Sequence, residues 1–215
     1  ALAPQASLTA LDDGTVLRLT AAAPLARIYT DRAPCAAQAY AHVPRGGRAL
    51  FPFVLRAAPA NGTVTLAATP FATESGVIMS AAPKIQVLRE VRVEANYGGC
   101  SKTSAGSTPP RDIAESVVRL APFDVYEVLT DEDSVALDGR FAYAALVRID
   151  IPRNALSGEY RSCIAASLNG RLHASAPITL RVYRTALPEA QKMDITHWLW
   201  PEPQNLTDRK PPEWW

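Results

Sequence analysis

The sequence predicts an all-β protein, an antiparallel β-sandwich of the immunoglobulin-like or jelly-roll-like kind, and three observations support this. Short segments with alternating apolar and polar residues recur along the chain, and this alternation is the period of a half-buried strand. Turn residues separate the segments, among them Asn169-Gly170, a strong hairpin signal. No helical pattern of ordinary length interrupts them. We therefore expect roughly nine or ten strands, followed by an extended C-terminal tail.

The clearest element is the hairpin centred on Asn169-Gly170. Apolar side chains alternate along both of its strands, so each strand has one face toward a core and one toward water. The core-facing positions are Tyr160, Ser162, Ile164, Ala166 and Leu168, then Ile178, Leu180 and Val182. Leu187-Pro188 ends the second strand and is predicted to be the hinge out of the sandwich.

Seven earlier segments are also predicted to be extended strands. They are residues 15–19, 26–30, 49–57, 62–67, 84–94, 125–129 and 139–151. In the third of these, Phe51 and Phe53 share one face with Ala49 and Leu55. Pro52 lies on the opposite face and cannot donate to a ladder, so this strand is predicted to be at a sheet edge or bulged.

Two longer segments have extended apolar faces. Residues expected on one face of the 84–94 segment are Ile85, Val87, Val91 and Val93. Those expected on one face of the 139–151 segment are Phe141, Tyr143, Ala145, Val147, Ile149 and Ile151. Both patterns indicate strands whose apolar face covers a core.

Composition and motifs exclude several classes of function. The 215 residues carry 22 basic and 21 acidic side chains, a net charge of +1, without a basic stripe of the kind that binds nucleic acid. The sequence contains no run of about 18 apolar residues, so it predicts no membrane-spanning helix. The sequence has no phosphate-binding glycine loop, no nucleophile elbow and no zinc motif. We expect no cofactor and no metal.

The three cysteines, Cys35, Cys100 and Cys163, lack metal-ligand spacing. Cys35 and Cys100 both lie in turn-like contexts, which makes a disulfide between them one prediction. Three unpaired cysteines are an equally good alternative. Asn61 and Asn205 begin glycosylation sequons, which are common by chance.

The tail differs in composition from the rest of the chain. All four tryptophans lie in the last 18 residues, and residues 195–200 alternate like a strand. Tryptophan side chains carry a large apolar area, which is unfavourable in water. We expect the tail to pack on the sandwich, on a partner or on a further domain.

Several stretches together resemble the N-terminal β-sandwich of glycoside hydrolase family 123-like proteins. They are residues 45–54 (RGGRALFPFV), 151–152 with 157–161 (IP…SGEYR), 180–183 with 187–188 (LRVY…LP), 197–201 (HWLWP) and 212–215 (PEWW). The chain departs from the family pattern at Gly47, where an acidic residue is usual, and at Pro52-Phe53, where Phe-Gln is common. The last two stretches resemble the first strand and first helix of that family's catalytic barrel.

The resemblance implies a non-catalytic accessory sandwich at residues 1–188 of a secreted or cell-surface carbohydrate-active protein. Residues 189–215 would be a linker and the start of a catalytic (β/α)₈ barrel that this chain does not contain. In that family an acidic pair acts on N-acetylated sugars, and the substrate's own N-acetyl group is the nucleophile. No catalytic residue is carried over to this chain. The expected partners are the C-terminal barrel or a neighbouring subunit, and a glycan.

Candidate substrate-binding residues are His197, Trp198 and Trp200, because aromatic faces stack on sugar rings and barrel strand ends line active sites. Packing between domains is the alternative for these three. His42 has no recognisable catalytic partner in the sequence, and His173 is expected to be an exposed or hydrogen-bonded strand residue. Two other functions remain open: a stand-alone carbohydrate-binding module, or a structural or adhesive surface protein that assembles through its tail.

Overall fold

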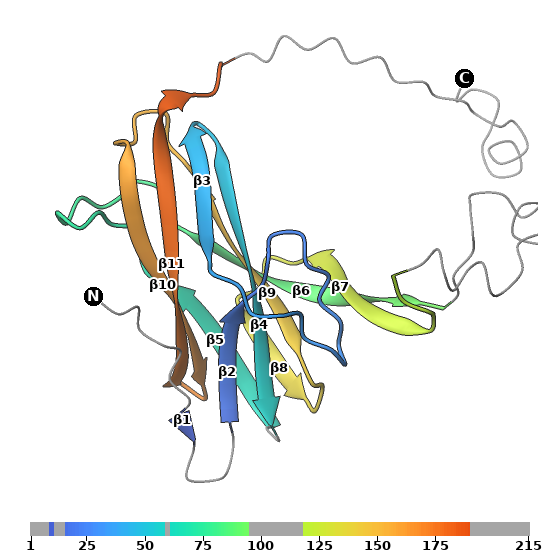
Figure 1. Cartoon of the computed structure of the whole chain (residues 1–215). Helices are drawn as coiled ribbons and strands as arrows, with labels where there is room; N and C mark the ends of the chain where they lie inside the picture. The colour runs from blue at the N-terminus through green and yellow to red at the C-terminus, as the bar shows by residue number, and fades with distance from the viewer. Residues whose placement is uncertain (1–8, 11–15, 59–60, 95–117, 190–215) are drawn as a thin grey trace, which may run out of the picture.

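The computed structural model describes residues 9–10, 16–58, 61–94 and 118–189, and in these ranges the chain is a β-sandwich without helices (Figure 1). No helix of the described residues is long and apolar enough to cross a membrane. The strands are β1 (Thr9–Ala10), β2 (Val16–Ala21), β3 (Tyr40–Arg45), β4 (Arg48–Ala58), β5 (Asn61–Ala68), β6 (Lys84–Val93), β7 (Phe123–Leu129), β8 (Ser134–Asp138), β9 (Tyr143–Asp150), β10 (Gly158–Leu168) and β11 (Arg171–Ala186). The predicted all-β sandwich is confirmed.

The strands form two sheets that pack face to face (Figure 1). Sheet A has the order β1-β2-β4-β9-β6-β7, and sheet B has the order β3-β11-β10-β5-β8. Neighbouring strands are antiparallel except β3 and β11, which run parallel. Among the described strands the chain changes sheets at every connection except β1–β2, β6–β7 and β10–β11, so the two sheets are interleaved in sequence.

The core lies between the sheets and is built from alternate residues of their inner faces. Every core-facing position predicted for the hairpin is buried, including Tyr160 and Leu180, which are at most 1% exposed. Phe51 and Phe53 of β4 are the largest fully buried side chains that sheet A contributes. Burying one such side chain contributes about 1.5–3 kcal/mol relative to leaving it exposed.

The prediction that Pro52 marks an edge or bulged strand is wrong for β4 as a whole. This strand lies inside sheet A, paired with β2 on one side and β9 on the other. The β2 ladder ends at the pair Ala21–Phe53, and the carbonyl of Pro52 accepts one last hydrogen bond, 2.9 Å, from the Ala22 amide. A residue's N and C=O point to the same side of a strand, so the missing N–H of Pro52 faces the end of β2, where no further pair is needed.

Two residues predicted on core faces are instead exposed. Val91 is 37% exposed, because β6 pairs with β9 only as far as Leu88 and continues beyond it with β7 as a two-stranded arm (Figure 1). Phe141 is 44% exposed, since it precedes the first residue of β9 and instead contacts Arg56, whose guanidinium lies 3.9 Å from the ring centre.

A second, smaller core lies on the outer face of sheet A. The segment between β2 and β3 crosses this face and places Ile28 against Val54, Tyr126 and Ala144. The Ile28 carbonyl accepts a hydrogen bond of 2.9 Å from the Tyr126 amide. The segment between β2 and β3 therefore covers part of the outer face of sheet A. The outer face of sheet B lies on the opposite side of the sandwich.

Candidate functional site

The site residues predicted from the tail, His197, Trp198 and Trp200, lie outside the described residues and stay predictions. The same holds for Cys100, so its predicted disulfide with Cys35 is untested. Cys35 itself is exposed in the segment between β2 and β3. The functional geometry that the structure does describe comes from elsewhere in the chain.

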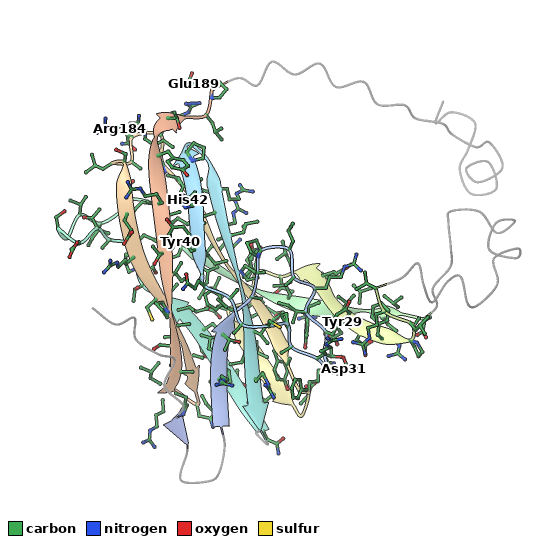
Figure 2. All side chains as sticks on the ribbon, viewed as in Figure 1. Tyr29, Asp31, Tyr40, His42, Arg184 and Glu189 are labelled. Carbon is green, nitrogen blue, oxygen red and sulfur yellow. The ribbon has the colours of Figure 1, made fainter. Side chains whose placement is uncertain are left out.

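Three aromatic rings gather on the outer face of sheet B, where β3 lies along β11. The His42 ring lies edge-to-face with Tyr40, with centroids 4.7 Å apart, and stacks on Tyr183 at 5.5 Å. The Tyr183 hydroxyl and His42 Nδ1 share a hydrogen bond of 2.7 Å. Figure 2 shows Tyr40 and His42 following one another along β3. Sequence reasoning found no partner for His42, because its hydrogen-bond partner Tyr183 becomes a neighbour only through the pairing of β3 with β11.

The strand registers explain why these rings share a face. Val43 and Val182 are paired and both buried, so the residues on either side of them, and every second residue beyond, point outward. Tyr40 and Tyr183 are accordingly 41% and 44% exposed. The sequence signal was present as alternation in β11, but the outward residues of β3 could be assigned only after its pairing was known.

Charged side chains continue this face across the next two strands. Arg181 of β11 lies between His42 of β3 and Glu159 of β10 in one cross-strand row. Arg161 lies two positions after Glu159 on β10. Its guanidinium donates hydrogen bonds of 3.0 and 3.1 Å to one carboxylate oxygen of Glu159. The face therefore passes from aromatic rings at β3 to paired charges at β10.

A hollow of about 470 Å³ borders the charged part of this face. It is lined by Thr73, Glu74 and Ser75 of the loop after β5, and by Gly158, Glu159 and Arg161 of β10. Mutual backbone hydrogen bonds of 3.0 and 2.8 Å between Ala72 and Arg161 hold the loop beside β10, and the loop projects beyond the strand in Figure 1. It forms a rim beside β10, on the side of this face away from the aromatic rings.

A separate cluster holds the chain where it leaves the sandwich. The Arg153 guanidinium donates a hydrogen bond of 2.6 Å to the Leu187 carbonyl, and the Leu187 amide donates one of 2.8 Å to the Arg45 carbonyl. The Arg45 guanidinium donates to the Arg184 carbonyl. Figure 2 shows Arg184 and Glu189 at this end of β11. The exit is thus fixed on both sides up to Leu187.

A polar network fastens the crossover between β8 and β9. Burial raises the pKa of Tyr126 to about 12, and its hydroxyl donates a hydrogen bond of 2.8 Å to the Ala142 carbonyl. Arg140 forms ion pairs with Glu90 at 2.6 Å and Asp138 at 2.9 Å. Burial also raises the pKa of Tyr143, whose hydroxyl donates to Asp138 at 2.9 Å. These phenols stay protonated near neutral pH, which suits a structural role rather than acid–base chemistry.

His173 occupies an unexpected position. In the register of β10 and β11, Ala166 pairs with Ala174 and Ser167 with Leu172, which leaves His173 as the extra residue of a bulge. Its side chain is 5% exposed, and its Nδ1 has no hydrogen-bond partner among the described residues. The expectation of an exposed or fully hydrogen-bonded histidine is therefore wrong, because bulges redirect side chains in ways that alternation does not predict.

No family model matches this sequence, and no curated protein matches it. Among solved structures, a family 123 glycoside hydrolase from Clostridium perfringens matches with a TM-score of 0.58 and 16% identity, over 80% of this chain and 28% of that chain. The N-terminal domain of PorA matches at a TM-score of 0.31, with 10% identity over 79% of this chain and 99% of that one. A non-cellulosomal cohesin from Archaeoglobus fulgidus matches at 0.28, with 10% identity over 68% and 87%.

The first of these likenesses establishes a shared fold. This chain has the β-sandwich architecture of a part of the glycoside hydrolase, and it spans a little over a quarter of that protein's length. At 16% identity, the fold is what is shared. The two lower TM-scores add nothing to this argument. The fold and site together define a β-sandwich domain with an outward aromatic and charged face.

Proposed function

We propose that this sandwich is a non-catalytic accessory domain of a secreted carbohydrate-active protein, and that it supports a glycoside hydrolase barrel following it in the chain. The observation that carries the proposal is the likeness to the Clostridium perfringens hydrolase, in which 80% of this chain corresponds to 28% of a larger enzyme. The domain division at residues 1–188 and 189–215 is part of this proposal.

The clamped exit supports the accessory role. The hydrogen bonds that Leu187 makes with Arg153 and Arg45 fix the direction in which the chain leaves β11. A domain attached just beyond such a point starts from a fixed position, whereas one attached by a free linker does not. This is the arrangement that a supporting domain requires.

Three described carboxyl groups, those of Asp31, Asp131 and Asp150, lack the raised pKa of a general acid. Glycoside hydrolysis requires a general acid whose pKa is raised. Hydrogen bonding from Arg119 lowers the pKa of Asp31, from Lys84 that of Asp131, and from Arg48 that of Asp150. The pKa of each of these three carboxyl groups is therefore lowered, whereas a general acid requires a raised pKa.

Two measurements test the proposal. Sequencing the gene past the codon for Trp215 should show an open reading frame for a (β/α)₈ barrel with an adjacent acidic pair. The 215-residue chain should not release chromophore from a chromogenic N-acetylhexosaminide, whereas the longer protein should. A gene that ends at Trp215, or hydrolysis by the 215-residue chain itself, would overturn the proposal.

A second candidate, a stand-alone carbohydrate-binding module, is favoured by one observation, the exposed aromatic cluster on sheet B. The two candidates require the same sandwich and differ only in whether a catalytic domain is joined to its C-terminal side. The same gene sequence separates them, because a binding module requires no catalytic barrel.

A further inference from the structure

The outer face of sheet B is a continuous surface with a defined extent. From β3 it crosses β11 and β10 and ends at the rim formed by residues 73–75. Three steps of one strand spacing make this about 15 Å. Aromatic rings bound one side, and a hollow of about 470 Å³ lies at the other.

The three rings are held in place before any ligand arrives. His42 contacts Tyr40 on one side and Tyr183 on the other, and the 2.7 Å hydrogen bond links the ring of His42 to the phenol of Tyr183. Both tyrosines still expose more than 40% of their surface. Rings that are already oriented lose little conformational entropy on binding. They present apolar faces with polar edges, the surface that matches the C–H faces and hydroxyl edges of a sugar ring.

The charges on this face are balanced. The hollow and the adjoining cross-strand row carry Arg161, Arg181, Glu74 and Glu159, two cations and two anions. Three hydroxyl groups, those of Thr73, Ser75 and Thr179, lie among them. A phosphate backbone would require a net positive surface. Donors and acceptors without net charge suit a neutral polyhydroxyl ligand.

We infer that the outer face of sheet B binds a neutral oligosaccharide, with sugar rings against Tyr40 and Tyr183 and hydroxyl groups hydrogen-bonded to Arg181, Glu159 and Arg161. The inference rests on the proposed carbohydrate role for the class of ligand. It assigns the contact to the sandwich itself, at residues separate from the tail tryptophans. Such a face would hold a polymeric or glycan-coated substrate close to the catalytic domain.

The test is titration of the purified 215-residue chain with tri-N-acetylchitotriose, cellotriose and maltotriose, monitored by ¹H–¹⁵N NMR and calorimetry. We expect at least one trisaccharide to bind. It should shift the amide signals of β3, of the part of β11 that carries Thr179, Arg181 and Tyr183, and of residues 72–75. Tyr40→Ala and Tyr183→Ala should each weaken binding about tenfold. Tyr183→Phe keeps the ring and should retain most of the affinity.

Phe141→Ala is the matched control, because Phe141 is an aromatic residue with the same 44% exposure as Tyr183 but lies just before β9 of sheet A, away from this face. It should leave binding unchanged. The inference is overturned if none of the three sugars binds, if the shifted amides lie outside this face, or if Phe141→Ala weakens binding as much as Tyr183→Ala. Preferential binding of a sulfated heparin trisaccharide would also overturn it.

The outcomes separate this inference from the proposed function. Sugar binding by a chain whose gene lacks a barrel would keep the binding face and remove the accessory role. A barrel gene combined with no sugar binding would keep the accessory role and remove the binding face. The NMR shifts of the unmodified chain give an answer even if a variant fails to fold.

Discussion

Arg153 and Leu187 are 34 residues apart in sequence, and the guanidinium of the first donates a 2.6 Å hydrogen bond to the carbonyl of the second. This bond joins the turn after β9 in sheet A to the end of β11 in sheet B. The Leu187 amide is also engaged, by the Arg45 carbonyl at 2.8 Å. The two sheets are therefore tied together at the point where the chain leaves them.

Replacing Arg153 by alanine should loosen this exit. Hydrogen bonds to charged groups contribute about 1.5–3 kcal/mol, and an exposed one contributes less. We expect Arg153→Ala to lower the free energy of unfolding by about 1 kcal/mol, measured in urea, and to speed limited proteolysis between residues 184 and 189. Arg171→Ala, at the opposite end of β11, is the matched control. Equal proteolysis of both variants would show that Arg153 does not hold the exit.

The raised pKa of Tyr126 predicts that the protein loses stability at alkaline pH. Its folded pKa is about 12, raised by burial from a reference value of 10. Between these values the unfolded chain loses its proton while the folded chain keeps it, so stability is full below pH 10 and falls as the pH rises toward 12. We expect a loss of about 1–2 kcal/mol from this group. Denaturation curves at pH 9, 10 and 11 should show it.

The control for this prediction is Tyr126→Phe. The variant should be less stable than the parent at pH 8, because the Ala142 carbonyl loses its buried donor at a cost of about 1–2 kcal/mol. Its stability should then fall less steeply between pH 10 and 11. Identical slopes for parent and variant would mean that Tyr126 titrates at its ordinary pKa in the folded protein.

Local patterns were sufficient to predict much of the fold. Asn169 has φ +50° and Gly170 φ +81°, as the predicted hairpin turn requires. The inward residues of β10 and β11 follow from alternation alone, because a one-residue slip would turn every apolar side chain to solvent. Errors occurred where a strand extended past its neighbours, as at Val91, or where the ladder ended inside a sheet, as at Pro52.

The binding face could not be predicted, because it depends on long-range pairing. The bond between His42 and Tyr183 spans 141 residues, and the parallel pairing of β3 with β11 has no local signal. The loop containing residues 73–75 reaches β10 through Ala72 and Arg161, which are also remote in sequence. Sequence reasoning instead favoured the tail tryptophans, because a cluster of aromatic residues close together in sequence can be recognised without knowing the fold.

Gly47 is one position at which the chain departs from the family 123-like pattern that its sequence resembles, and the structure gives a physical reason for a glycine there. A Cβ at Gly47 would lie 2.7 Å from Val43 Cγ1 and 2.9 Å from the Pro44 carbonyl oxygen. The second contact is with backbone, which cannot move without changing the turn between β3 and β4. Gly47→Ala and Gly47→Glu should each destabilise the fold by about 1–3 kcal/mol. Thermal unfolding would show this, and unchanged melting temperatures would contradict it.

Phe71 anchors the rim of the proposed binding face. It is 0% exposed and stacks on Phe51 with centroids 6.1 Å apart, so the loop that carries residues 73–75 is pinned to the main core. Removing a buried phenylalanine costs about 3–5 kcal/mol. Phe71→Leu keeps most of the volume, so we expect a smaller loss, about 1 kcal/mol, in a variant that stays folded.

Phe71→Leu should also raise the amide hydrogen exchange of residues 72–78 relative to that of β10, because exchange reports local opening of a segment. Val77→Ala is the matched control, since Val77 lies in the same loop but is 41% exposed. It should change neither stability nor exchange. If Phe71→Leu lowers stability while exchange in the loop stays at the parent rate, then Phe71 contributes to the core alone, and the rim is held by its hydrogen bonds to Arg161.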